Sequence, residues 1–323
     1  MNEARNRLTK LKVPPLEPVP NSFREGGGAR GGGHYTILHK TEYKYYGPVS
    51  LCHNIAKLMP RDTDTQVCKN TEIHISPRPD VLDEYEDFYG NKVVYFAIQH
   101  EHTSLTVTVK SEIIKQAAAS PEFNWYSSAS WEEIKQLIQK STEYIDARQY
   151  IAATPMTGFN DDIKEYALQS FKSGSTLFDA ALNLTSRIFK DFTFKPGFTT
   201  ITTPAEEVFI ARKGVCQDFA HLAIACIKSL GLPVRYVSGY VETVPPKGEE
   251  KMVGVDASHA WFSVFIPGMG WMDFDPTNNI IPGSQHVTIG WGRDYADICP
   301  LKGVILSSGP HELKVSVDMR REG

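Results

Sequence analysis

The spacing of apolar residues changes near residue 120, and this change constrains the fold more than any other feature of the chain. Between about residues 34 and 115 the sequence reads as short strands separated by turns; in one of them Leu105, Val107 and Val109 alternate with Thr and Ser. A period of two is typical of a strand with one buried face. From about Pro121 the apolar residues recur at helical spacing. These patterns predict an α+β protein in which a small antiparallel β-sandwich domain precedes a helical region.

Two helix-start signals mark the helical region. Ser130 and Glu133 form a capping-box pattern ahead of apolar residues at helical spacing. Thr203, Pro204 and Glu206 form another, with Thr203 as the cap and Pro204 at the first helical position. Further helices are expected over residues 161–172, from residue 175 or 176 to 189, and from 216 to 230. Strands are expected in VRYVSGYVETV, HAWFSVFI, GWMDFD and, near the end, HELKVSVDM.

The first 33 residues are rich in Pro and then in Gly, which is typical of a flexible tail or an appendage. We therefore expect three regions: a tail over residues 1–33, an N-terminal β domain over 34–120 and a second domain over 121–323.

Composition narrows the possible partners and the compartment. Apolar residues make up 41% of the chain, charged residues 22%, and the net charge is −4. These values are ordinary for a globular protein and favour neither a nucleic-acid nor a membrane partner. No apolar stretch approaches the 18 residues of a membrane span, and the first 33 residues lack the apolar segment of a signal peptide. The five cysteines are few and widely spaced, so we expect a reducing, cytoplasmic setting.

Three residues have the chemistry and the expected placement of a thiol catalytic site. Cys216 begins a helix after Gly214, and a helix N-terminus favours the negative thiolate, which is the reactive form. A histidine can take the thiol proton, and a carboxylate can fix the tautomer of that histidine. His259 opens one strand and Asp275 closes the next. A hairpin in which Phe265 pairs with a residue at position 271 would place both side chains on one face.

The motifs around these residues resemble a known family. GVCQDFAHL, GLPVRYVSGY, HAW and GWMDFDPT follow one another as they do in the bacterial transglutaminase-like superfamily, whose members are often labelled candidate cysteine proteases. HKTEYKYYGPV and LMPR resemble the β region that often precedes that domain in bacterial proteins. The resemblance implies a papain/transglutaminase-like core, in which a helix bearing Cys216 packs on an antiparallel sheet bearing His259 and Asp275. It assigns these residues as nucleophile, base and orienting acid, and by family analogy it suggests a peptide-ligase-like partner system.

Several residues near these three have alternative roles. Asp273 lies two residues before Asp275 on the same strand face and is a second candidate for orienting the histidine. His221 lies about 140° around the helix from Cys216, which favours a structural contact. Cys226 is flanked by apolar residues and is expected to be inert core. No second close-spaced ligand pair is visible, so neither a metal nor another cofactor is expected.

Further residues are expected to shape the site. The backbone N–H of Cys216 at the helix start is the natural oxyanion donor, and Gln217 is a candidate for completing the site. Trp261 and Trp271 read first as core aromatics, and the alternative is that they shield the site from water.

The expected function is thiol-dependent acyl transfer through a thioester, with hydrolysis of a peptide or isopeptide bond in a peptide or protein substrate preferred. A crosslinking transglutaminase with an amine acceptor, and a binding module with a vestigial triad, remain alternatives.

Overall fold

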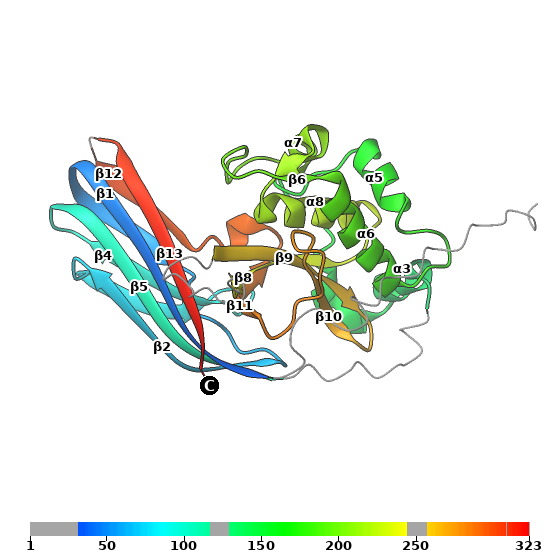
Figure 1. The fold of residues 1–323 in the computed structure, drawn as a ribbon, viewed down its shortest axis with the longest axis horizontal. Helices are drawn as coiled ribbons and strands as arrows, with labels where there is room; N and C mark the ends of the chain where they lie inside the picture. The colour runs from blue at the N-terminus through cyan, green and yellow to red at the C-terminus, as the bar shows by residue number, and fades with distance from the viewer. Residues whose placement is uncertain (1–31, 117–128, 244–256, 308, 323) are drawn as a thin grey trace, which may run out of the picture.

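The computed structural model describes residues 32–116, 129–243, 257–307 and 309–322. Its main strands form two antiparallel sheets, and a group of helices packs against the second sheet (Figure 1). The α+β class predicted from the periodicity is therefore confirmed. The predicted tail lies outside the described residues, apart from its last two.

The first sheet contains seven strands and curls around its own core (Figure 1). They are β1 (Gly33–Ala56), β2 (Gln66–Ser76), β3 (Val81–Glu86), β4 (Lys92–Ile98), β5 (His102–Lys115), β12 (Leu301–Ser307) and β13 (His311–Glu322). Strand β1 spans the whole sheet: β5 and β4 pair along one edge of it, and β13 and β12 along the other. Its register shifts between Lys44 and Val49, where the pairing with β5 is interrupted.

The first sheet draws on two distant parts of the chain. The strands of the N-terminal β region belong to one seven-stranded sheet. Strands β12 and β13, from within the range 121–323, complete that sheet. Sequence patterns reveal strands but not which strands pair with one another. The pairing of β1 with β13 joins His34 to Glu322.

The second sheet has the strand order β10-β9-β8-β11. Its strands are β8 (Val234–Val241), β9 (Ala257–Ile266), β10 (Gly270–Phe274) and β11 (His286–Gly292). The helices are α3 (Trp131–Lys140), α4 (Ile145–Arg148), α5 (Asp161–Leu168), α6 (Leu177–Asp191), α7 (Ala205–Ala211) and α8 (Cys216–Ser229), with 3-10 turns η1 (Thr142–Tyr144) and η2 (Tyr295–Asp297). A short parallel pair joins β6 (Thr193–Phe194) to β7 (Lys213–Gly214).

Helix α8 is central to this second unit. It is apolar around most of its circumference and is buried from Asp218 to Lys228, as expected for a helix enclosed on several sides. It contacts β8 and β9 of the sheet as well as α5, α6 and α7. The N-terminal end of α8 is thereby fixed against the strands that carry the expected site residues.

The helix starts were predicted with mixed success. Ser130 caps α3 through the expected capping box with Glu133. The prediction for Thr203 is wrong: Pro204 occupies the cap position and α7 begins one residue later than expected. The Thr203 hydroxyl instead accepts the N–H of Thr200, because a threonine in a turn can satisfy local backbone groups as readily as a helix end.

Two side-chain amides join the two sheets. Gln66 donates to the carbonyl of Thr288 at 2.8 Å and accepts its N–H at 2.9 Å. Asn91 makes the same pair of contacts with Trp291, at 2.8 and 3.0 Å. Both partners lie on β11, an edge strand. The amides therefore take the place of a neighbouring strand and satisfy backbone groups that an edge leaves open.

Replacing Gln66 by alanine is expected to lower the free energy of unfolding by about 2–4 kcal/mol. The change leaves two backbone groups of Thr288 without their partner, and each unpaired buried group costs about 1–3 kcal/mol. Chemical denaturation measures the effect. Gln99→Ala, at an exposed position, is the control and should change stability by less than about 0.5 kcal/mol. Similar losses in both variants would contradict the assignment of Gln66 as a link between the sheets.

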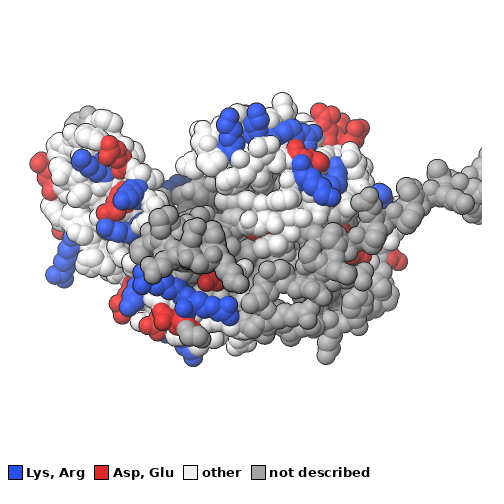
Figure 2. Space-filling model, viewed as in Figure 1, with Lys and Arg blue, Asp and Glu red and all other residues white. Residues whose placement is uncertain are grey.

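Among the described residues, no helix is long and apolar enough to cross a membrane. Figure 2 shows Lys and Arg together with Asp and Glu on both halves of the visible face. This mixture agrees with the small net charge of the chain.

Candidate active site

Cys216 is the first residue of α8 and follows a tightly held turn. Oδ2 of Asp218 accepts the N–H of Val215 at 2.7 Å and the hydroxyl of Thr199 at 2.6 Å. A Cβ atom on Gly214 would lie 2.7 Å from that oxygen, so glycine is required where the carboxylate folds back. The cysteine is therefore presented at a helix N-terminus by a turn with little freedom to move.

The β9–β10 hairpin brings His259 and Asp275 together. Phe265 pairs with Trp271, which is the predicted register, and the same register continues to the end of β10. Asp275 follows β10 directly and lies diagonally across from His259, within reach of its ring. The His259 Nε2 to Asp275 Oδ2 distance is 2.7 Å, and both side chains are buried.

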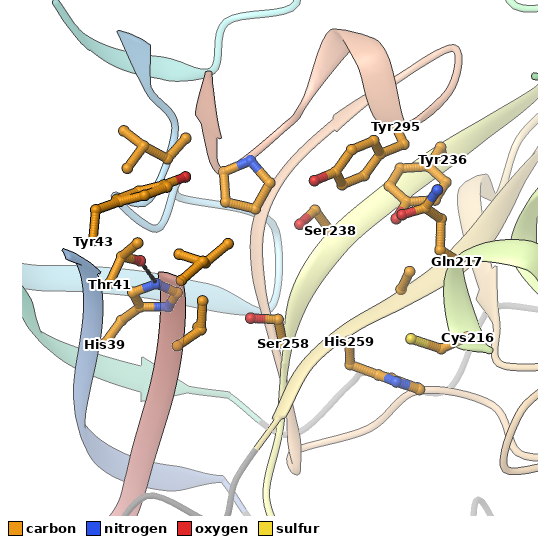
Figure 3. A pocket seen from close by; sticks show the side chains of 15 residues that line it. His39, Thr41, Tyr43, Cys216, Gln217, Tyr236, Ser238, Ser258, His259 and Tyr295 are labelled. Atoms are coloured by element: carbon orange, nitrogen blue, oxygen red, sulfur yellow. Dashed lines mark hydrogen bonds between the residues drawn. The ribbon is translucent and has the colours of Figure 1, made fainter. Parts of the chain in front are cut away.

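Figure 3 shows the Cys216 side chain beside the His259 ring. Because Nε2 contacts Asp275, Nδ1 is the ring nitrogen that is left to serve the sulfur. Burial lowers the pKa of His259, but its hydrogen bonds to Asp275 and Cys216 outweigh burial and raise the pKa to about 10. The ring is therefore an imidazolium at neutral pH, with one N–H toward the carboxylate and one toward the sulfur.

Asp275 is fully buried and accepts hydrogen bonds on both oxygens. Oδ1 receives the backbone N–H groups of Thr277 and Asn278, at 2.9 and 3.2 Å. Oδ2 receives His259, the Asn278 amide at 2.8 Å and His286 at 3.1 Å. Burial alone would raise the pKa of Asp275, but the hydrogen bonds from the two histidines hold it far below its usual range. The carboxylate stays ionised and fixes the orientation of His259.

Asp273, the second candidate, lies elsewhere on the sheet. It pairs with Ser263 on β9, and its charge favours the protonated forms of Lys115 and Arg235. The structure brings Asp275 to His259 and does not bring Asp273 there.

Sequence reasoning missed His286 and Asn278. His286 lies on β11, on the far side of β8 from His259, so no spacing along the chain indicates their approach. Asn278 could have been suspected from the DPTNN turn, since Asn often hydrogen-bonds within turns. Both donate to the same oxygen of Asp275. This carboxylate is therefore the centre of a polar cluster and not only the third member of a linear triad.

The cluster of His259, Asp275 and His286 also has the residue types of a metal site, with its atoms within 4.8 Å of one another. Two ligands of a tetrahedral zinc, each about 2.1 Å from the metal, lie about 3.4 Å apart. The two nitrogen-to-oxygen distances are shorter, at 2.7 and 3.1 Å. The spacing therefore suits hydrogen bonds to a carboxylate better than metal ligation.

Replacing His286 by phenylalanine is expected to lower the free energy of unfolding at pH 7, because Asp275 loses a buried donor. The deficit should shrink as pH falls, for two reasons. Because the pKa of Asp275 is depressed in the folded protein, this residue stabilises the fold at pH values above the pKa that it has in the unfolded chain. That contribution to the free energy of unfolding is lost in acid. Burial also lowers the pKa of His286 in the folded protein. Below about pH 6.5 the unfolded chain therefore binds a proton on this histidine more readily than the native protein does, and this destabilises the native protein in acid.

Denaturation at pH 7 and pH 4 measures this difference. His286→Gln keeps an N–H donor and should recover part of the loss at pH 7. A deficit that is the same at both pH values, with no recovery by glutamine, would show that the ring acts by packing alone.

Cys216 and His259 open onto a cavity of about 330 Å³. Gln217 lines it, and the amide nitrogen of Gln217 donates to the carbonyl of Ile201 at 3.0 Å. Trp261 is fully buried and lies beside His259, with ring centroids 6.1 Å apart, so it supports the site from within. The structure does not bring Trp271 to the cavity: this ring packs on Tyr150 at 5.0 Å.

The remaining candidates have structural surroundings. His221 accepts the backbone N–H of Tyr295 through Nε2, at 3.1 Å, and burial lowers the pKa of His221 to about 3. Cys226 is fully buried, and burial raises its thiol pKa to about 12. Both observations agree with the structural roles expected from their positions.

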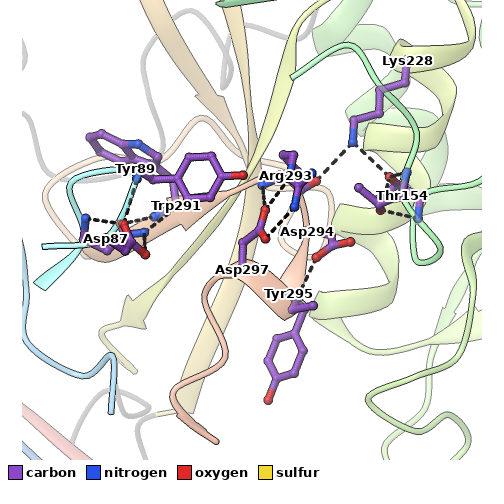
Figure 4. A network of polar contacts seen from close by, with 12 residues as sticks. Asp87, Tyr89, Thr154, Lys228, Trp291, Arg293, Asp294, Tyr295 and Asp297 are labelled. Atoms are coloured by element: carbon purple, nitrogen blue, oxygen red, sulfur yellow. Dashed lines mark hydrogen bonds and ion pairs between the residues drawn. The ribbon is translucent and has the colours of Figure 1, made fainter. Parts of the chain in front are cut away.

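A polar network steadies the segment that carries Tyr295 (Figure 4). Arg293 forms an ion pair with Asp297 at 2.8 Å. Lys228 on α8 reaches the carbonyl of Arg293 at 3.3 Å, and Asp294 caps η2 by accepting the N–H of Ala296. Tyr295, which lines the cavity, is therefore held from both sides of its short turn.

Two family models match the chain. The bacterial transglutaminase-like N-terminal region matches residues 35–114, and the transglutaminase-like superfamily matches residues 164–276. An uncharacterized protein of Mycobacterium tuberculosis is 37% identical over 290 residues, which cover 88% of this chain and 92% of the relative. The chain belongs to the transglutaminase-like superfamily and carries the bacterial N-terminal region.

More distant relatives agree with this placement. A protein-glutamine gamma-glutamyltransferase of Pseudomonas aeruginosa is 30% identical over 119 residues, which cover 34% of this chain and 18% of that protein. A solved structure from Cytophaga hutchinsonii, named as a candidate cysteine protease, has a TM-score of 0.70 at 20% identity and covers 90% of this chain and 91% of that one. The latter likeness shows a shared fold.

Proposed function

We propose that this protein is a thiol-dependent acyl-transfer enzyme that hydrolyses peptide or isopeptide amide bonds through a thioester. The observation that carries the proposal is the placement of Cys216, at a helix N-terminus, on the same cavity as His259, which is hydrogen-bonded to Asp275. The imidazolium and the helix end both place positive charge beside the sulfur, and the thiolate is the form of cysteine that attacks a carbonyl.

The same geometry supports each step. The Cys216 thiolate attacks the amide carbonyl, and the C–N bond breaks as His259 gives its Nδ1 proton to the leaving amine. The products of this step are a thioester and a neutral imidazole. The imidazole then removes a proton from the acceptor as the acceptor attacks the thioester. The thiolate leaves, and His259 regains its charge beside Asp275.

The oxyanion forms next to the start of α8. The first α-helical hydrogen bond of α8 runs from the N–H of Phe219 to the carbonyl of Val215. The N–H of Cys216 lies before this bond and has no acceptor within the helix. We assign this N–H as an oxyanion donor, since the first N–H groups of a helix have no partner within it.

A second candidate replaces water by an amine acceptor, and the Pseudomonas relative motivates it. A peptide library incubated with the protein, with and without a primary amine, distinguishes the two by mass spectrometry. Hydrolysis yields free acids in both samples. Transamidation yields amine adducts that appear only in the second.

The vestigial-triad alternative is tested by iodoacetamide near pH 6. A thiol paired with an imidazolium should be alkylated rapidly there, whereas an isolated thiol is mostly protonated and reacts slowly. Slow labelling of Cys216, combined with an unchanged peptide library, would refute the acyl-transfer function.

A further inference from the structure

The cavity beside Cys216 lies between the two sheets, and its far wall belongs to the first one (Figure 3). We propose that this wall, formed by β1 and β13, selects an extended polypeptide substrate whose acyl residue carries an uncharged side chain. The inference rests on the acyl-transfer function proposed above and adds a substrate class to it.

The wall is a continuous two-strand surface. Thr41 pairs with Val315, and Tyr43 pairs with Leu313, on neighbouring strands. Side chains of paired residues, and those two positions apart, share one face of a sheet. All four side chains line the cavity that Cys216 and His259 bound from the opposite side.

The wall offers no charge to a ligand. Among the described residues that line this cavity there is no Asp, Glu, Lys or Arg. His39 also contributes, but burial lowers its pKa to about 4, and its two ring nitrogens contact Thr41 and Tyr240 at 2.9 Å. A charged acyl side chain that packs on the wall would lose water and gain no counter-charge from it, which is costly.

The wall is also partly open to solvent. Leu313 is 53% exposed and Val315 is 48% exposed, although they face the cavity. An apolar ligand group would cover both, and removing this apolar surface from water favours binding. Their exposure is therefore what an apolar binding surface shows when it is unliganded.

A second cavity adjoins the one beside Cys216. It has a volume of about 440 Å³ and shares Tyr43, Tyr295 and Leu301 with the first. It adds apolar lining from Met156 and Ile305. Two cavities that meet along a common wall accommodate a run of residues, so the geometry favours a polypeptide segment over a single amino-acid derivative.

Peptidyl chloromethyl ketones with Leu, Lys or Glu at the reacting position test the proposal. The rate at which each modifies Cys216, followed by intact mass and divided by the rate with iodoacetamide, isolates recognition from thiol reactivity. The Leu reagent should react at least about tenfold faster than the Lys and Glu reagents. A three-residue Leu reagent should react faster than a one-residue Leu reagent. Equal normalised rates in either comparison would overturn the proposal.

A wall variant and its neighbour sharpen the test. Leu313→Glu places a carboxylate on the wall and should raise the Lys-to-Leu rate ratio about tenfold. Lys314→Glu introduces the same group on the next residue, whose side chain points to the other face, and should leave the ratio unchanged. Equal effects of the two variants would overturn the wall assignment. A Cys216 that reacts with iodoacetamide no faster than Cys68 would refute the acyl-transfer function itself.

Discussion

Cys216→Ala is expected to abolish amide cleavage, with a fall in kcat of at least about 10⁴-fold. The change removes the only sulfur that the structure places at a helix N-terminus beside an imidazolium, within the part of the chain it describes. Steady-state assay of the cleaved peptide measures the loss, and circular dichroism confirms that the variant is folded.

Cys226→Ala is the matched control on the same helix. Its thiol is buried, and burial raises the thiol pKa, so activity should stay within about twofold of the native protein. The removed sulfur leaves only a small void, whose cost is about 1 kcal/mol of stability. Equal loss of activity in both variants, at unchanged folding, would refute Cys216 as the nucleophile.

Asp275→Asn should lower kcat by about 10³–10⁴-fold while the protein remains folded. An asparagine at this position has nearly the same shape but no charge, so it neither holds His259 as an imidazolium nor fixes its tautomer. The pKa of His259 should fall from about 10 toward or below its ordinary value. The ring should then lose its charge at a lower pH, and NMR titration of its carbon-bound protons would follow this.

Asp273→Asn is the control for that experiment. Asp273 lies on the same strand but acts on Lys115 and Arg235, so this change should alter stability more than kcat. If Asp273→Asn costs as much activity as Asp275→Asn, the orienting role of Asp275 is wrong.

The sequence predicted the placement of the hairpin because local rules determine it. A tight turn with alternating strands allows few registers, and those with an odd number of loop residues put His259 and Asp275 on a common face. The predicted Phe265–Trp271 pairing is the one observed. The start of α8 at Cys216 was equally predictable, since Gly214 interrupts the preceding element and an apolar run follows.

The parts of the fold and of the site that the sequence did not predict depend on contacts between distant segments. His286 reaches Asp275 from an edge strand, and no periodicity encodes which strand lies next to which. The closure of the first sheet by β12 and β13 was missed for the same reason. The two readings of Trp271, as a core aromatic or as a shield of the site, could not be separated by sequence either, and in the structure its ring packs on Tyr150 from a distant segment.

The return of β13 to β1 has a consequence for synthesis of the chain. Residues 311–322 supply one strand of the substrate wall, whereas Cys216, His259 and Asp275 all precede them. A ribosome therefore completes the catalytic residues before it completes the surface proposed to select the substrate. A nascent chain that has folded its helices and second sheet before β13 emerges would hold the thiol in an open half-cleft, and selectivity would arrive only when β13 pairs with β1.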